Sequence, residues 1–108
     1  MEREERIKME VKQLQAEIKE LLDSKGFAYG KDSFYEKASL AHTEISELVD
    51  VIKKKGHDAQ EDIEAEFADI IIRTMNFALM YGFDAETAIR KKMDANWKRP
   101  YRYNTFKK

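Results

Sequence analysis

The chain has 108 residues, of which 43% are hydrophobic and 38% are charged, and its formal net charge at pH 7 is −1. This length suits one small domain, and the nearly balanced charge gives no general case for binding nucleic acid or a membrane surface. No apolar run approaches the ~20 residues of a membrane span, and the charged N-terminus lacks the apolar core of a signal peptide. The sequence has no cysteine, so disulfides and thiol chemistry are excluded and a cytoplasmic location is expected.

Apolar residues alternately three and four apart predict a first helix within residues 1–25, which Gly26 ends. A second helix is expected from Ser33, which forms a capping-box pattern with Glu36, to Gly56. The stripe of the first helix is long for so small a domain, so self-association is expected to cover it. That stripe consists of Ile7, Val11, Leu14, Ile18 and Leu21.

A third helix is expected from Asp58, which forms a capping-box pattern with Glu61, to about Tyr81. Between residues 67 and 80 it is apolar on nearly every side, which predicts a central position in the fold. Its one polar stripe consists of Glu66, Asp69, Arg73 and Asn76. Within that stripe, Arg73 is expected to pair with Asp69, four residues earlier.

The fourth helix is expected to begin at Asp84, its N-cap, and to end before Pro100. Residues 98–108 form a basic tail with no predicted structure. Four helices with short connections predict a single all-α domain over residues 1–108 that resembles a four-helix bundle. We expect this domain to assemble as a dimer or a tetramer.

Four carboxylates carry the chemical information in this sequence. Glu44 and Glu47 are three residues apart, as are Glu66 and Asp69, so each pair occupies one face of its helix. If the two helices fold back on each other about the turn at residues 56–58, all four carboxylates meet at one level, roughly 14 Å from the turn at ~1.5 Å rise per residue.

Four negative charges share a partly buried site only when a cation joins them. Because every ligand would be an oxygen, Mg²⁺ is expected, with Mn²⁺ as a possible substitute. A diiron site would need Glu-x-x-His pairs, and neither His42 nor His57 follows a glutamate by three. The simpler alternative is a set of solvated glutamates, but Glu47 and Glu66 have no basic residue four positions later.

These residues resemble the MazG-like, all-α nucleoside triphosphate pyrophosphohydrolases. The resemblance rests on the two carboxylate pairs, on the segment from Glu66 to Arg73, and on the later Lys92-x-x-x-Asn96-x-x-Arg99-Pro100. It implies Mg²⁺-dependent cleavage of an NTP or dNTP to the monophosphate and pyrophosphate by a homo-oligomer. The sequence departs from the family pattern, as we know it, at Asn76, where related members often carry Asp, and in the tail at residues 103–105.

On this interpretation Glu44, Glu47, Glu66 and Asp69 are both catalytic and metal-binding. Water is expected to attack the α-phosphorus, with one of the four carboxylates orienting or deprotonating it, and Glu47 is the candidate for this role. The resemblance also makes Lys92, Asn96 and Arg99 candidate phosphate ligands; from the residues alone, a solvated basic helix end explains them as well. Phe27 is a further candidate substrate contact, through stacking on a base.

Three other functions are compatible with the sequence. A non-catalytic oligomerisation or regulatory module would use the first helix to bind a partner. A hydrolase of other phosphate esters would use the same carboxylates and differ in its products. A nucleic-acid adaptor would use the basic, aromatic tail, although a solvated tail is the more usual explanation of such a short segment.

Overall fold

The computed structural model describes residues 10–100, and every regular element within that range is helical. The elements in chain order are α2 (Val11–Lys25), the short 3₁₀ turn η1 (Lys31–Ser33), α3 (Phe34–Lys55), α4 (Gln60–Tyr81) and α5 (Ala85–Lys98). The predicted all-α class and the order of four helices are therefore confirmed. Ile7 of the first predicted stripe and residues 101–108 of the predicted tail lie outside the described residues.

Glycines end three helices where the sequence predicts it, at Gly26, Gly56 and Gly82, and the first and last of them adopt the left-handed conformation. Gly26 after α2 has φ 73°, and Gly82 after α4 has φ 70°. A side chain with a Cβ is strained in this left-handed region, whereas glycine adopts it freely. At the start of α5, Asp84 is the N-cap as expected, because its carboxylate accepts a hydrogen bond from the backbone N–H of Glu86.

The two predicted capping boxes are wrong. Ser33 occupies the N-cap of α3, but its hydroxyl donates to the carbonyl of Gly30 inside the preceding 3₁₀ turn. The N-cap of α4 is Ala59 rather than Asp58, and no side chain caps that end. In both places a tight turn just before the helix supplies backbone contacts that the local sequence pattern does not reveal.

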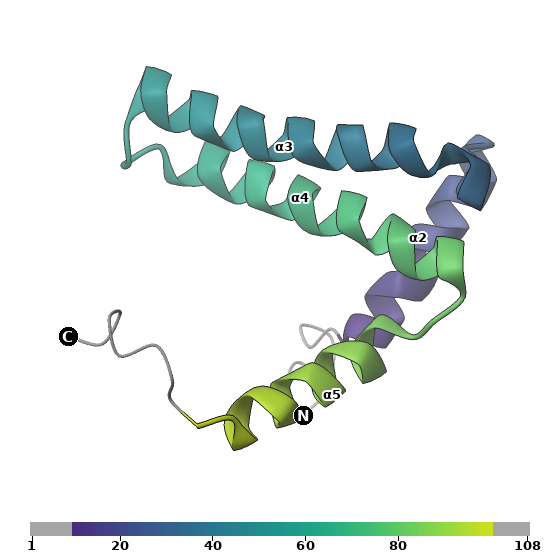
Figure 1. The fold of residues 1–108 in the computed structure, drawn as a ribbon. Coiled ribbons are helices and arrows are strands. Elements are labelled where there is room, and N and C mark those ends of the chain that lie inside the picture. Colours follow the sequence, from purple (N-terminus) through teal and green to yellow (C-terminus); the bar gives the residue numbers. More distant parts are fainter. Residues whose placement is uncertain (1–9, 101–108) are drawn as a thin grey trace, which may run out of the picture.

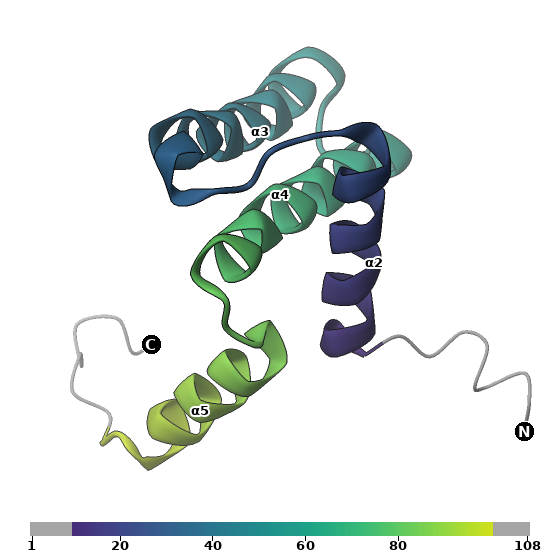
Figure 2. The same cartoon turned by 90° about the vertical axis from the view of Figure 1, so that its right-hand side faces the viewer.

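The helices α3 and α4 form a long antiparallel hairpin, and α2 crosses α4 near the end of α4 (Figures 1 and 2). The helix α5 packs on α2 and leads away from the hairpin, so the described chain is more open than the bundle predicted from sequence. The buried core lies where α2, α4 and α5 meet, and it consists of Ile18, Met75, Ala78 and Ala85.

The prediction that the third helix is central is correct for its position, since α4 contacts both α3 and α2. Its first half, however, has an uncovered apolar face, with Phe67 58% exposed and Ile71 37% exposed. The same is true of α3, where Ile45 and Val49 are about half exposed. Among the described residues, no helix is long and apolar enough to cross a membrane.

Candidate metal centre

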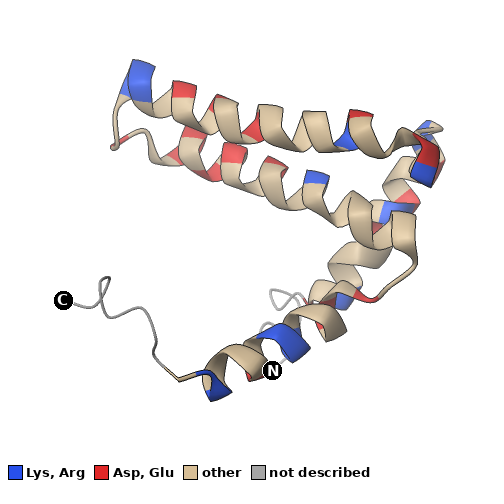
Figure 3. Ribbon diagram, in the orientation of Figure 1, with Lys and Arg blue, Asp and Glu red and all other residues tan. Residues whose placement is uncertain are grey.

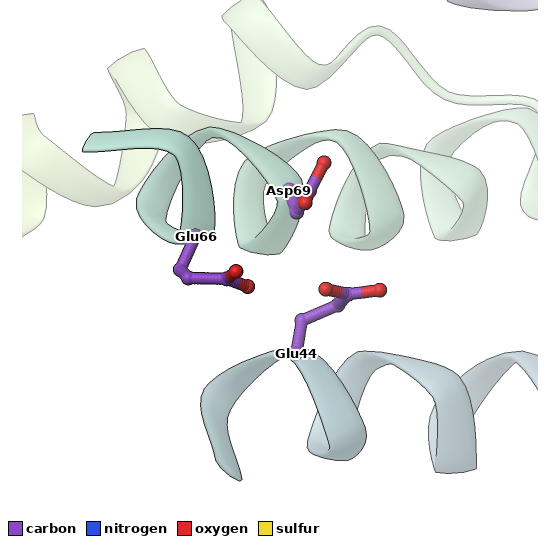
Figure 4. Close-up of side chains that lie close together, drawn as sticks. All are labelled: Glu44, Glu66 and Asp69. Atoms are coloured by element: carbon purple, nitrogen blue, oxygen red, sulfur yellow. The ribbon is translucent and has the colours of Figure 1, made fainter. Parts of the chain in front are cut away.

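The α3–α4 hairpin brings three of the four predicted carboxylates together. Glu44 comes from the middle of α3, and Glu66 and Asp69 come from successive turns of the first half of α4. One oxygen from each of these side chains lies within 4.8 Å of the other two. Figure 4 shows Glu66 and Glu44 extending into the gap between the helices from opposite sides, with Asp69 on the next turn of α4. This is the convergence that the matched spacing predicts.

Two oxygens of this cluster are buried and have no hydrogen-bond donor among the described residues. They are Oε1 of Glu44 and Oε1 of Glu66, and the whole Glu44 residue is only 8% exposed. Burying a carboxylate without a partner is costly, so native proteins pair such groups with donors or cations. Three carboxylates, two of which leave a buried oxygen unpaired, form a donor set suited to a hard divalent cation such as Mg²⁺.

Glu47, the fourth predicted ligand, lies at the exposed edge of the cluster. Its oxygens are outside the group of three, but the charges of Glu44 and Glu66 still affect its ionisation. The negative charge of Glu44 raises the pKa of Glu47, and partial desolvation and the charge of Glu66 add to this effect. Like charges raise a carboxyl pKa because each disfavours ionisation of the next. Glu47 is therefore electrostatically part of the site.

Arg73 does not pair with Asp69, contrary to the sequence-based expectation. Its Nε donates to Oε2 of Glu44 on the facing helix at 3.1 Å, and this is the ion pair that Arg73 forms among the described residues. The reason is geometric: Glu44 is buried and directly opposite, so pairing across the hairpin satisfies a group that would otherwise be isolated. Arg73 shares the polar stripe of Glu66 and Asp69, as the sequence indicates, but its partner lies on the facing helix.

A pocket of about 270 Å³ opens beside the carboxylates, between α2 and the hairpin. Glu44, Asp69 and Arg73 form part of its lining, and Phe27 lines it too, so this sequence-predicted substrate contact lies next to the cluster. Lys25, at the end of α2, adds a second positive charge to the lining. The sequence did not single out Lys25 as functional, because a lysine in the last turn of a helix is an ordinary dipole partner.

The predicted phosphate contacts lie elsewhere. Lys92 and Asn96 are on exposed faces of α5, and Arg99 follows its last turn. None of the three lines the pocket beside the carboxylates. Acidic residues predominate on the hairpin near its turn, whereas basic residues are frequent on α5 (Figure 3). Within one chain, the structure thus separates the candidate cationic contacts of α5 from the carboxylates.

The family of the chain follows from a comparison with protein-family models. The model of the MazG nucleotide pyrophosphohydrolase domain matches residues 37–102, which is 66 of the 108 residues and includes all four carboxylates. No curated protein and no solved structure gives a significant match to the chain.

Proposed function

Since this chain belongs to the MazG nucleotide pyrophosphohydrolase family, we propose that it hydrolyses an NTP or dNTP to the monophosphate and pyrophosphate with Mg²⁺. Glu44, Glu66 and Asp69 would hold the cation, and Glu47 would complete the set from the edge. The observation that carries this proposal is that Glu44 and Glu66 each have a buried, unpartnered oxygen and belong to a group of three carboxylates whose oxygens come within 4.8 Å of one another.

A bound divalent cation would offset the charge of the phosphates and make water more acidic. The remaining chemistry falls to side chains of the protein. Glu47 is suited to accept the proton of the attacking water, because it is exposed and lies at the edge of the carboxylate cluster. The water oxygen bonds to the α-phosphorus, the bond to the bridging oxygen breaks, and pyrophosphate leaves with that oxygen.

The two cations beside the carboxylates have a separate task. Arg73 and Lys25 line the pocket where the nucleotide would enter, and both attract phosphate oxygens. Arg73 offers a planar fork of donors and Lys25 a point charge. Because Arg73 already contacts Glu44, it is placed to bridge the metal ligands and the substrate.

We also propose that the protein acts as a homo-oligomer, a dimer or a tetramer. The exposed apolar side chains on the two hairpin helices, Ile45, Val49, Phe67 and Ile71, support this. The separation of α5 from the carboxylates of the same chain is a second reason. In an oligomer, the site of a neighbouring copy could receive its phosphate contacts from α5, through Lys92, Asn96 and Arg99. Light scattering on the purified protein tests the assembly: a monomer at micromolar concentration would contradict it.

The activity is tested by incubating the protein with each NTP and dNTP and Mg²⁺ and identifying the products. Our proposal expects the monophosphate and pyrophosphate in equal amounts, with no activity after chelation. Release of inorganic phosphate would show a different phosphate-ester or anhydride hydrolase built on the same carboxylates. Absence of turnover with every nucleotide, in Mg²⁺ and in Mn²⁺, would leave a non-catalytic binding module as the explanation of the fold.

A further inference from the structure

Asn76 has a buried hydrogen-bond acceptor that nothing in the described residues uses. The residue is 3% exposed, and its Oδ1 has no donor. Its Nδ2 donates to the backbone carbonyl of Arg73 at 3.1 Å. A carbonyl only accepts, so the amide nitrogen has to face it, and this fixes the amide orientation. What Asn76 offers beyond its own helix is therefore an acceptor, which is costly to leave unpaired.

Asn76 lines the same pocket as Glu44, Asp69 and Arg73. The volume of about 270 Å³ is just below the ~300 Å³ at which ligand pockets usually begin, so it accommodates one ring system rather than a whole triphosphate. Most of the remaining lining is apolar. The apolar lining residues are Ile18, Leu21, Leu22, Phe27 and Ile72. Apolar walls beside the buried amide of Asn76 suit a flat heterocycle, whose faces are apolar and whose edge is polar.

The positions of the polar groups along α4 match the layout of a nucleotide. Asp69 and Asn76 are seven residues apart, which is two turns and about 10 Å along the helix, and Arg73 lies between them. Asp69 is exposed and Asn76 is buried, so Asn76 is the more deeply placed of the two groups. An α-phosphate at the carboxylates would direct the sugar past Arg73 and the far edge of the base towards Asn76.

We propose that Asn76 selects nucleotides whose base carries an amino group at its far edge, the position opposite the sugar. That group is an N–H donor in cytosine and adenine and an acceptor oxygen in uracil, thymine and guanine. Oδ1 of Asn76 pairs with the first kind and repels the second, and the hydrogen bond of Nδ2 to the carbonyl of Arg73 holds Oδ1 in place. The assignment rests on the proposed function for the identity of the ligand as a nucleotide.

Uncharged nucleosides test this inference without any metal, since they carry no phosphate for the carboxylates to repel. We would titrate cytidine, adenosine, uridine and guanosine into ¹⁵N-labelled protein and follow the amide signals. Cytidine and adenosine are expected to shift the side-chain amide of Asn76 and the backbone of Ile72. They are also expected to bind about tenfold more tightly than uridine and guanosine, the equivalent of one lost hydrogen bond.

Two controls separate a specific contact from a structural effect. Asn76→Leu keeps the branching of the side chain, removes the acceptor and should abolish the preference, whereas Thr74→Val, two residues away and outside this pocket, should retain it. Should Asn76→Leu fail to fold, the 4-deamino analogue of cytidine removes the donor from the ligand instead, and it should bind the wild-type protein about as weakly as uridine.

Equal affinity for all four nucleosides, an unchanged preference in Asn76→Leu, or perturbations confined to α5 would each overturn the inference. The triphosphate assay is scored separately. If no nucleotide releases pyrophosphate but cytidine and adenosine still show the expected preference at Asn76, the proposed reaction fails and the base-selecting role of Asn76 holds.

Discussion

Arg73 gives the sharpest prediction, because the structure makes it the counterion of a buried metal ligand. In Arg73→Gln, the carboxylate of Glu44 loses a charged partner whose Nε lies 3.1 Å away. Opposite unit charges at that distance attract by ~5 kcal/mol at an effective dielectric of ~20. The Arg73 side chain is 38% exposed, so solvent screening reduces the net loss to about 1–2 kcal/mol of folding stability.

The same substitution should strengthen cation binding. A metal ion at Glu44 has to tolerate the guanidinium of Arg73 and compete with it for Oε2, and neither obstacle exists in Arg73→Gln. We expect Mg²⁺ to bind about tenfold more tightly, which corresponds to ~1.4 kcal/mol. At saturating Mg²⁺, this gain would offset most of the stability lost without metal.

Thermal unfolding with and without Mg²⁺, together with calorimetric titration of Mn²⁺, measures both effects. For a domain of this size, the melting temperature of metal-free Arg73→Gln should fall by about 5–10 °C, and most of that gap should close in Mg²⁺. The matched control is Arg90→Gln on α5, where the guanidinium is exposed and 4.0 Å from Asp94, and it should change neither quantity. If Arg73→Gln binds cations no more tightly than wild type, the counterion role is refuted.

Three further predictions test the site and the core. Glu66→Gln should lower pyrophosphate release at least ~100-fold, since it removes a metal ligand, whereas Glu64→Gln on the same helix should not; comparable rates for the two variants would contradict the site. Met75→Ala should cost about 2–5 kcal/mol in urea unfolding because Met75 is buried, whereas Met93→Ala on exposed α5 should cost far less. Glu47→Gln should stabilise the metal-free protein at neutral pH. Because the folded pKa of Glu47 is raised, the protonated carboxyl favours folding below the ordinary glutamate pKa, and this advantage is lost as pH rises through the folded value. The stability difference between Glu47→Gln and wild type should therefore vanish in acid, and a pH-independent difference would refute the coupling.

The sequence predicted what depends on periodicity. The spacing of Glu44 on one helix and of Glu66 and Asp69 on the next, with a glycine turn between them, was enough to place the three carboxylates together. Helix order and the ends at Gly26 and Gly82 also followed from local rules. These features are set by residues close in sequence or by a single turn.

What the sequence did not predict depends on contacts between distant residues. Arg73 pairs with Glu44 rather than Asp69 because the facing helix presents a buried charge. The pattern of residues within one helix does not predict this preference. The direction of α5, which packs on α2 rather than on the hairpin, likewise depends on how Ile18 and Ala85 meet in the core. The unpaired acceptor of Asn76 depends on the hydrogen bond between its Nδ2 and the carbonyl of Arg73, which the sequence does not reveal.

The central claim is that Glu44, Glu66 and Asp69 hold a divalent cation, and paramagnetic broadening by Mn²⁺ tests it most directly. In a ¹⁵N-labelled sample with substoichiometric Mn²⁺, we expect the amide signals of residues around Glu44 and Asp69 to broaden first, with Mg²⁺ restoring them. Signals at the far end of α5 should stay sharp. Broadening centred on another acidic site such as Asp23 would contradict the account. So would broadening that persists unchanged when Glu44 or Glu66 is replaced by glutamine.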